Sequence, residues 1–204
     1  MDDLLALKED ICKVCHLKMF DTEIEFVESI RDRSIELADT PSSEAVAWRI
    51  SESQNLNGQT ICPYNGTRFH ILISKVSPHC KGGFWMGTVA HEMTHVNDIA
   101  LYLKEYGLRN YEEMATRDDY DAFFVFTEIH AYKNGANYLQ WLACKGNFSD
   151  SWKKETKLVY EQGVLNELIK PIQENLTLLK QSGNLERYLY DIARVIGKLL
   201  SLYS

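Results

Sequence analysis

Two histidines four positions apart, with a glutamate directly after the first, form an HExxH motif at His91, Glu92 and His95. In a helix these histidines lie one turn apart on the same face, so both imidazoles can reach one metal ion. Glu92 is rotated from His91 by roughly 100°, the angular step between neighbouring helical residues. That offset keeps the carboxylate away from the ion but leaves it able to hydrogen-bond a water on the metal. The motif therefore predicts a catalytic zinc site in which Glu92 acts as the general base.

The sequence around the motif predicts a buried helix over residues 84–103. Its residues are mostly apolar or small, and they are distributed around several faces. A helix that is apolar on most sides is normally buried, and buried imidazoles and carboxylates need partners. A shared metal ion supplies such partners. The alternative is a helix whose two histidines simply lie on a polar face.

Catalytic zinc takes three protein ligands and keeps one position open, so a third ligand is required. A second apolar helix is predicted over 119–132, with Glu128 in its middle. A carboxylate among apolar neighbours is costly unless it pairs with a cation or coordinates a metal, so we expect Glu128 to be the third ligand. The alternatives are His130 and Asp121, although His130 is more simply a core histidine bonded to a backbone carbonyl. Asp98 or Asp121 is expected to orient the ligand histidines.

The stretch from Thr88 to His95 reads TVAHEMTH and is similar to the T-L-A-H-E-L-G-H stretch of small single-domain zincin metallopeptidases. These include the phage-repressor-cleaving and stress-response zinc peptidases, in which the zinc glutamate opens an E-x-x-A segment, and the segment that starts at Glu128 is similar to it. The resemblance covers roughly residues 57–143. It implies an α+β, zincin-like fold with a small antiparallel sheet of two to four strands. The HExxH helix, a second ligand-bearing helix and additional N- and C-terminal helices complete this fold.

The chain departs from the resemblance in two respects. The 32 residues between His95 and Glu128 make a longer gap than compact members have, which implies an inserted loop. The residues after His95 also lack the glycine and third histidine of the metzincin pattern.

Before the motif, β-rich runs predict short strands at 44–51, 59–62 and 67–74, arranged as an antiparallel sheet. In a zincin the edge strand lies along the cleft and pairs with an extended substrate, and we expect 67–74 to be that edge or its immediate neighbour. The following loop contains His79 and Cys80. These are weaker ligand candidates, because a thiolate would compete with the hydrolytic geometry.

A hydrogen-bond donor for the developing oxyanion is expected beside the metal. Tyr132 is placed in the catalytic set together with Glu92, and the alternative donors are His130, Tyr120 and His70.

The chain has 204 residues, a formal net charge of −7 and 25% charged residues. This composition is typical of a soluble globular protein, and the negative charge argues against nucleic-acid binding, which needs a basic face. No apolar run reaches membrane-spanning length, so no membrane association is expected. The acidic start of the chain differs from a secretory signal, so we expect a cytoplasmic protein whose five cysteines are free thiols.

At the N-terminus a helix is predicted over 4–20, and a capping box at 22–25 predicts a second helix that the turn-forming residues at 40–43 stop. The segment from Cys12 to His16 matches the CxxCH signature of covalent haem attachment. That chemistry requires export, which the N-terminus does not support, and a zinc knuckle would need two further ligands. We therefore expect core cysteines.

The C-terminal part is predicted to form a helix from 150 to about 170, where Pro171 breaks it. Two more helical stretches follow, separated by residues 182–184, and the last of them covers 185–200. The last helix has one apolar stripe, which predicts packing on the catalytic body or a docking surface for a protein partner or a second copy. We expect a catalytic domain over 1–145, including the N-terminal helices. A helical extension over 146–204 is expected to pack on it as one structural unit.

The favoured function is a zinc-dependent metallopeptidase that hydrolyses peptide bonds in peptide or protein substrates. A non-catalytic or latent zinc-binding regulatory module would keep the ligands without turnover, although an intact Glu92 favours catalysis. A carboxylate-bridged di-iron helical protein would use Glu92 and His95 as one E-x-x-H, but it needs a second such motif and the chain has none.

Overall fold

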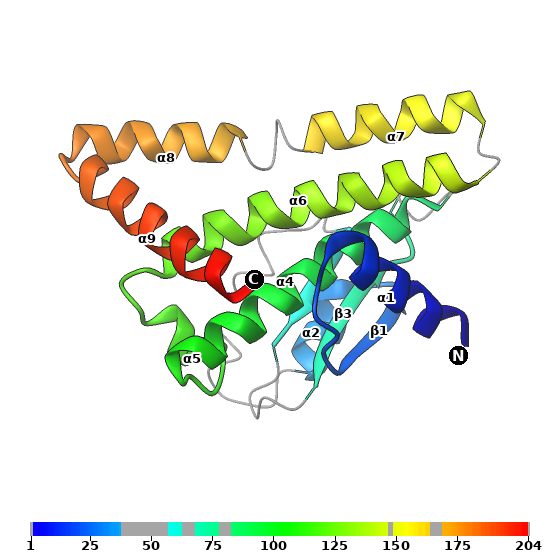
Figure 1. The fold of residues 1–204 in the computed structure, drawn as a ribbon, viewed down its shortest axis with the longest axis horizontal. Helices are drawn as coiled ribbons and strands as arrows, with labels where there is room; N and C mark the ends of the chain where they lie inside the picture. Colours follow the sequence, from blue (N-terminus) through cyan, green and yellow to red (C-terminus); the bar gives the residue numbers. More distant parts are fainter. Residues whose placement is uncertain are drawn as a thin grey trace.

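Helices surround a small sheet in the computed structural model (Figure 1), which describes residues 2–37, 57–62, 68–77, 83–146, 149–163 and 169–203. In chain order the elements are α1 (Asp2–Cys15), β1 (Thr22–Val27), α2 (Ile30–Leu37), β2 (Gly58–Ile61), β3 (Phe69–Ser74), α4 (Trp85–Tyr106), α5 (Tyr111–Ala115), α6 (Tyr120–Lys145), α7 (Asp150–Gly163), α8 (Lys170–Gln181) and α9 (Leu185–Tyr203). This architecture confirms the α+β class, with a small sheet and mostly helices. The predicted strand at 44–51 and the loop residues His79 and Cys80 lie outside the described residues.

The sheet is mixed, so the prediction of an antiparallel sheet was wrong. Its strand order is β1-β3-β2, with β1 parallel to β3 and β2 antiparallel to it. The strand predicted at 67–74 is β3, which occupies the centre of the described sheet. The outer strand that contacts α4 is β2, so β3 is the immediate neighbour of this edge.

The helix predicted from residue 22 onward was wrong in its first part, because Thr22–Val27 form β1. The segment TEIEFV alternates polar and apolar residues, which is the period of a strand. Ile24 and Phe26 pack against the core, while Glu25 pairs with Arg33 of α2 at 2.8 Å. The helix itself begins after Ser29, whose hydroxyl oxygen accepts a hydrogen bond from the Asp32 N–H at 3.2 Å.

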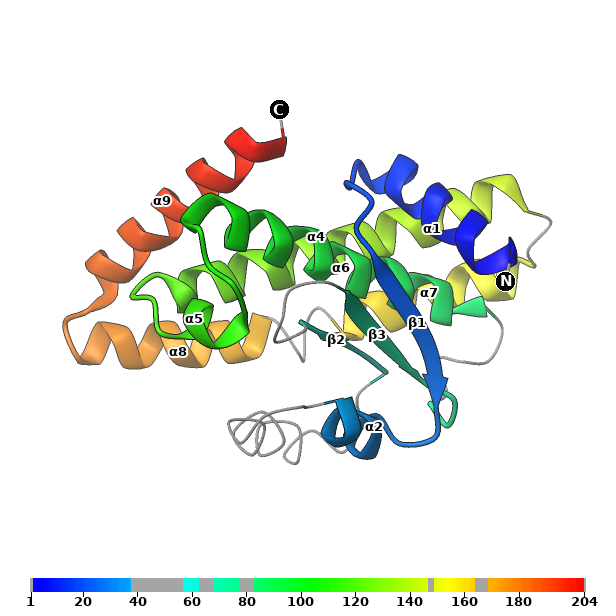
Figure 2. The same ribbon diagram turned by 90° about the horizontal axis from the view of Figure 1, so that it is seen from below.

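The sheet lies between α2 on one face and α4 with α6 on the other (Figure 2). Alternate residues of a strand point to opposite faces. Ile71 and Ile73 of β3 therefore enter the main core together with Val89 of α4. His70 points to the α2 face, where its Nδ1 lies 3.4 Å from the Glu25 carboxylate.

The two longest described helices, α4 and α6, confirm the helices predicted around His91 and Glu128, and they pack against each other. An inserted loop was expected between His95 and Glu128, but most of these residues are helical. The gap holds the last turns of α4, the short helix α5 and the first turns of α6. Gly107 ends α4 with a φ of 64°, a left-handed conformation that favours glycine.

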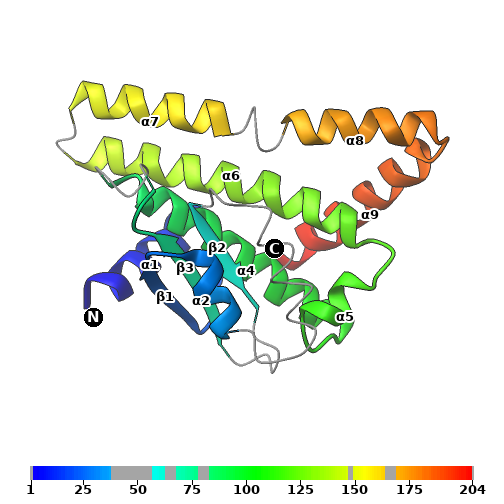
Figure 3. The same cartoon turned by 180° about the vertical axis from the view of Figure 1, so that it is seen from behind.

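The C-terminal helices pack back onto α6 and α4. Helix α7 lies along α6, and α8 leads into α9, which returns to contact α6 and α4 (Figures 1 and 3). The described part of the helix predicted from 150 to about 170 is α7 (Asp150–Gly163), and residues 164–168 lie outside the described part of the chain. Helix α8 carries Pro171 in its first turn, where the missing N–H is tolerated. Trp152 of α7 is buried and stacks on Phe84 with the ring centroids 5.4 Å apart. None of the described helices combines the length and apolar character needed to cross a bilayer.

The cysteines of the CxxCH segment lie on α1, and Cys15 belongs to the core as predicted. Burial raises the pKa of the Cys12 and Cys15 thiols, to about 12 for Cys15. The Cys15 thiol lies 3.6 Å from the Asn134 carbonyl oxygen, so α1 is held against α6.

Asp119, directly before α6, is a carboxylate that joins three parts of the fold. It accepts hydrogen bonds from Tyr102 at 2.5 Å and from Tyr106 at 3.1 Å, both on α4. Arg117 and, from α9, Arg194 reach it at 2.9 and 3.3 Å. Burial alone would raise the pKa of Asp119, but the hydrogen bonds from Arg117 and Tyr102 outweigh this effect and hold the pKa below its usual value. The cluster fixes the start of α6 against α4 and α9.

We expect Asp119→Asn to lower the free energy of unfolding by about 2 kcal/mol, because buried hydroxyl and guanidinium groups lose their charged acceptor. Urea unfolding at pH 7 measures the change, and Asp118→Asn, at the exposed neighbouring residue, is the matched control. Because the folded pKa of Asp119 lies below the unfolded value, its contribution is fully present above about pH 4 and is lost as the pH falls further. Equal unfolding midpoints for both variants would show that the cluster does not hold the helices together.

Candidate metal centre

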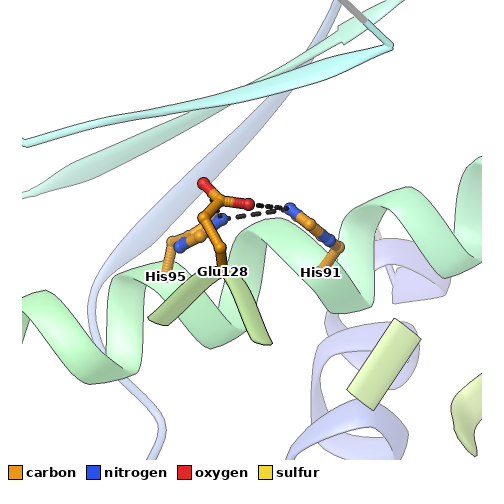
Figure 4. Close-up of side chains that lie close together, drawn as sticks. All are labelled: His91, His95 and Glu128. Atoms are coloured by element: carbon orange, nitrogen blue, oxygen red, sulfur yellow. Dashed lines mark hydrogen bonds and ion pairs between the residues drawn. The ribbon is translucent and has the colours of Figure 1, made fainter. Parts of the chain in front are cut away.

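The three predicted ligands converge between α4 and α6 (Figure 4). His91 and His95 project from successive turns of α4, and Glu128 faces them from α6. The two Nε2 atoms are 3.0 Å apart, and the carboxylate oxygens of Glu128 lie 3.8 Å from His91 Nε2 and 3.5 Å from His95 Nε2. Ligand atoms of a tetrahedral zinc ion, each at about 2.1 Å from it, stand roughly 3.4 Å apart. The donor set and its spacing therefore fit one such ion with a fourth position open.

Burial keeps both histidines in the form that binds metals. It lowers the pKa of His91 well below its usual value, and the neighbouring His95 adds to this shift. Burial also lowers the pKa of His95 to about 4, although the charge of Asp98 opposes the change. At pH 7 both imidazoles are neutral, which is the state that a metal ligand requires.

Glu92 lies beside this group, between α4 and β2. Its side chain is 6% exposed, and the Thr60 hydroxyl of β2 donates a hydrogen bond to its Oε2 at 2.8 Å. Burial raises the pKa of Glu92 to about 8, the bond from Thr60 opposes the rise, and the charge of Glu128 adds to it. A carboxyl group with a pKa in this range can take up and release a proton near neutral pH.

Strand β2 passes so close to α4 that Gly58 has no space for a side chain. A Cβ at this position would lie 2.6 Å from Thr88 Cγ2 and 3.0 Å from Glu92 Oε1. Neither Gly58 nor Thr60 was predicted from the sequence to be part of the site. The local signal was the Asn57–Gly58 pair, which is typical of a turn, and only the path of β2 brings these residues to Glu92.

A buried polar network surrounds His95. Its Nδ1 lies 3.0 Å from Thr127 Oγ1, and the Thr127 hydroxyl donates to Asp98 Oδ2 at 3.0 Å. His130 Nδ1 also lies 3.0 Å from Asp98, and Asn134 Nδ2 lies 3.0 Å from His130 Nε2. A bond from His130 to a backbone carbonyl was expected, and the structure gives each ring nitrogen a side-chain partner, Asp98 at Nδ1 and Asn134 at Nε2. His130 therefore lies outside the ligand group, and Asp98 approaches His95 through Thr127.

The predicted oxyanion donors occupy different places. The Tyr132 ring packs edge-on against His91 with the ring centroids 4.6 Å apart, so Tyr132 lies at the centre. Tyr120 hydrogen-bonds Tyr111 near the start of α6. His70 lies on the α2 face of the sheet, away from α4. The geometry therefore brings Tyr132 to the metal centre and removes His70 from it.

Asp121, the alternative third ligand, is exposed on the first turn of α6. Its charge acts on Tyr188 of α9, where it contributes to a raised pKa after the larger effect of burial. Of the two carboxylates expected to orient the histidines, Asp98 lies in the network around His95, whereas Asp121 lies near α9.

A second group of possible ligands, Glu23, Glu25 and His70, lies on the α2 face of the sheet. Arg33 bonds both carboxylate oxygens of Glu25 at 2.8 and 3.1 Å. Arg68 bonds Glu23 at 3.1 Å. Because each carboxylate is already balanced by a guanidinium, this group is a surface ion-pair cluster.

Comparison of the chain with models of known families, with curated proteins and with solved structures finds no match. The function of the centre must therefore be inferred from its own geometry and chemistry.

We expect about one zinc ion per chain in the wild-type protein, and Glu128→Gln to lose most of it because the substitution replaces a charged ligand by an amide. Elemental mass spectrometry on the purified full chain measures the content. Glu174→Gln, at an exposed glutamate of α8, is the control and should retain the metal. Full zinc occupancy in Glu128→Gln would exclude this carboxylate as a ligand.

Proposed function

We propose that the chain is a zinc-dependent metallopeptidase of the zincin type. The observation that carries this proposal is the position of Glu92, which is buried directly beside the His91, His95 and Glu128 group without being one of its three members. A fourth polar group next to a three-ligand set is the arrangement that hydrolysis requires, because a proton must be taken from water and later delivered to the leaving group. The single carboxylate in this ligand set also suits one ion better than a di-iron pair.

Each residue has a defined task in this proposal. His91, His95 and Glu128 hold the ion, which when bound supplies Lewis acidity and makes water more acidic. Glu92 accepts the proton of the attacking water and returns it to the departing amine. Thr60 keeps the Glu92 carboxyl in place through its 2.8 Å hydrogen bond. Tyr132, packed against His91, donates a hydrogen bond to the developing oxyanion.

A peptide is the substrate class that best suits the surroundings of Glu92. Strand β2 is one of the two outer strands of the described sheet, and Thr60 of this strand touches Glu92 directly. An extended peptide backbone that pairs with β2 would lie along the ligand group. This geometry favours cleavage within an extended segment of a peptide or protein.

We expect Glu92→Gln to lower peptide hydrolysis by about 100-fold or more while zinc binding is unchanged, because the proton acceptor is removed and the ligands remain. A peptide-library screen with mass-spectrometric detection of products measures cleavage, and elemental analysis measures zinc. Glu105→Gln, an exposed residue of the same helix, is the control.

Cleavage should also stop when a chelator removes the metal and return when zinc is added. A wild-type protein that binds zinc but cleaves no peptide would contradict the peptidase and favour a zinc-binding regulatory module. Unchanged hydrolysis in Glu92→Gln would contradict the role of this residue.

Tyr132→Phe should lower turnover by about 100-fold, the typical cost of removing one oxyanion donor, with little change in the Michaelis constant or zinc content. The comparison is with Tyr190→Phe, at a residue of α9 that is 69% exposed. Equal turnover in the two variants would leave Tyr132 as a packing residue only.

A further inference from the structure

We propose that Thr127 is a positioning residue that sets the tautomer and orientation of His95 for metal binding. This inference rests on the metal centre proposed above, but not on peptide hydrolysis. Thr127 directly precedes Glu128 on α6 and is 3% exposed. Its hydroxyl lies 3.0 Å from Nδ1 of His95, while Glu128 Oε1 lies 3.5 Å from Nε2 of the same ring. Two consecutive residues of one helix therefore hold the two nitrogens of one imidazole.

The direction of the hydrogen bonds follows from the chemistry of the groups. The Thr127 hydroxyl has one hydrogen, and an ionised carboxylate can only accept. The 3.0 Å bond to Asp98 uses that hydrogen, so the Thr127 oxygen must accept a hydrogen from His95 Nδ1. His95 then carries its proton on Nδ1 and presents the lone pair of Nε2 to His91 and Glu128. This is the tautomer in which Nε2 binds a metal.

Asp98, which accepts the hydrogen bond from Thr127, is itself held in place by further hydrogen bonds. Asp98 is fully buried, accepts a hydrogen bond from Asn97 at 3.2 Å and lies 3.0 Å from His130 Nδ1. Asn97 in turn accepts a hydrogen bond from the Lys18 N–H at 2.9 Å, which ties the network to the segment after α1. The Thr127 hydroxyl thus has a fixed acceptor, and its bond gives the ligand imidazole a fixed direction.

The proposed role of Thr127 depends on its hydroxyl group and not on the volume of its side chain, and two variants distinguish these properties. Thr127→Val keeps the shape and removes the hydroxyl, and Thr127→Ser keeps the hydroxyl. We expect zinc binding to weaken by about 10- to 100-fold in Thr127→Val, the usual cost of losing a group that orients a ligand, and to stay close to wild type in Thr127→Ser. Thr127→Ala, compared with Thr127→Ser, provides a second pair that differs only in the hydroxyl if valine is not tolerated.

The dissociation constant is measured on the metal-free full chain by competition with a chromophoric zinc chelator, and circular dichroism confirms folding. Thr177→Val, at an exposed threonine of α8, is the matched control and should bind zinc like the wild type. Wild-type affinity in both Thr127→Val and Thr127→Ala would overturn the proposal.

The ¹⁵N spectrum of the imidazoles in the metal-free protein gives a readout that needs neither metal nor activity. The proposal expects His95 protonated on Nδ1 in the wild type and in Thr127→Ser, and a shift toward the Nε2-protonated tautomer in Thr127→Val. If His95 is protonated on Nε2 in the wild type, the proposed hydrogen bonds from His95 to Thr127 and from Thr127 to Asp98 are contradicted. A further outcome is zinc binding that depends on the Thr127 hydroxyl in a protein that cleaves no peptide. That result would contradict the peptidase proposal but would support the role of Thr127.

Discussion

The packing of α4 against α6 buries polar side chains within an apolar interface, and the rest of the molecule is organised around satisfying them. Thr94, Asp98, Thr127 and Asn134 are all buried at this interface. Thr94 donates to the Ala90 carbonyl at 2.8 Å and accepts from Asn134 at 3.1 Å. A shift of either helix by one residue would turn these groups by roughly 100° and leave them unbonded, at about 1–3 kcal/mol for each. The polar groups therefore select one register, and that register brings Glu128 to the two histidines.

The sheet contributes to the centre through one close approach. Gly58 lets β2 lie against α4, and the Thr60 hydroxyl then reaches both the carboxylate and the carbonyl oxygen of Glu92, at 2.8 and 2.9 Å. Glu92 is thus held by Thr60 of the sheet, whereas His95 is held by Thr127 and Glu128 of α6. This division lets the buried Glu92 remain next to the candidate metal site without joining the group of three possible ligands.

The C-terminal helices support the same arrangement from a distance. Asp119 accepts hydrogen bonds from a tyrosine hydroxyl of α4, from Arg117 in the preceding turn and from Arg194 of α9. These bonds fix the start of α6, the helix that carries Thr127 and Glu128. Trp152 of α7 stacks on Phe84, directly before α4. Both helices of the centre are therefore braced at their N-terminal ends by residues that are remote in the chain.

Much of the centre could be inferred from the chain alone, for two physical reasons. His91, Glu92 and His95 lie within one helical stretch, where spacing along the chain determines the angle between side chains. Glu128 stands out because a carboxylate in an apolar helix requires a partner. The helices around both were predictable from the same apolar pattern, and the alternation in TEIEFV would have identified β1 if it had been weighed against the capping box.

Tertiary structure alone decided how these elements meet. The parallel direction of β1 depends on the path of the chain between β1 and β3, which no local pattern specifies. Thr60, Thr127 and Gly58 are ordinary residues in a strand or a helix, and their importance comes from contacts with α4 across the fold. His70 and Asp121 carry suitable chemistry but lie on other faces of their elements. Sequence spacing determines the relative positions of side chains within one element, whereas the packing of elements determines which of them share a site.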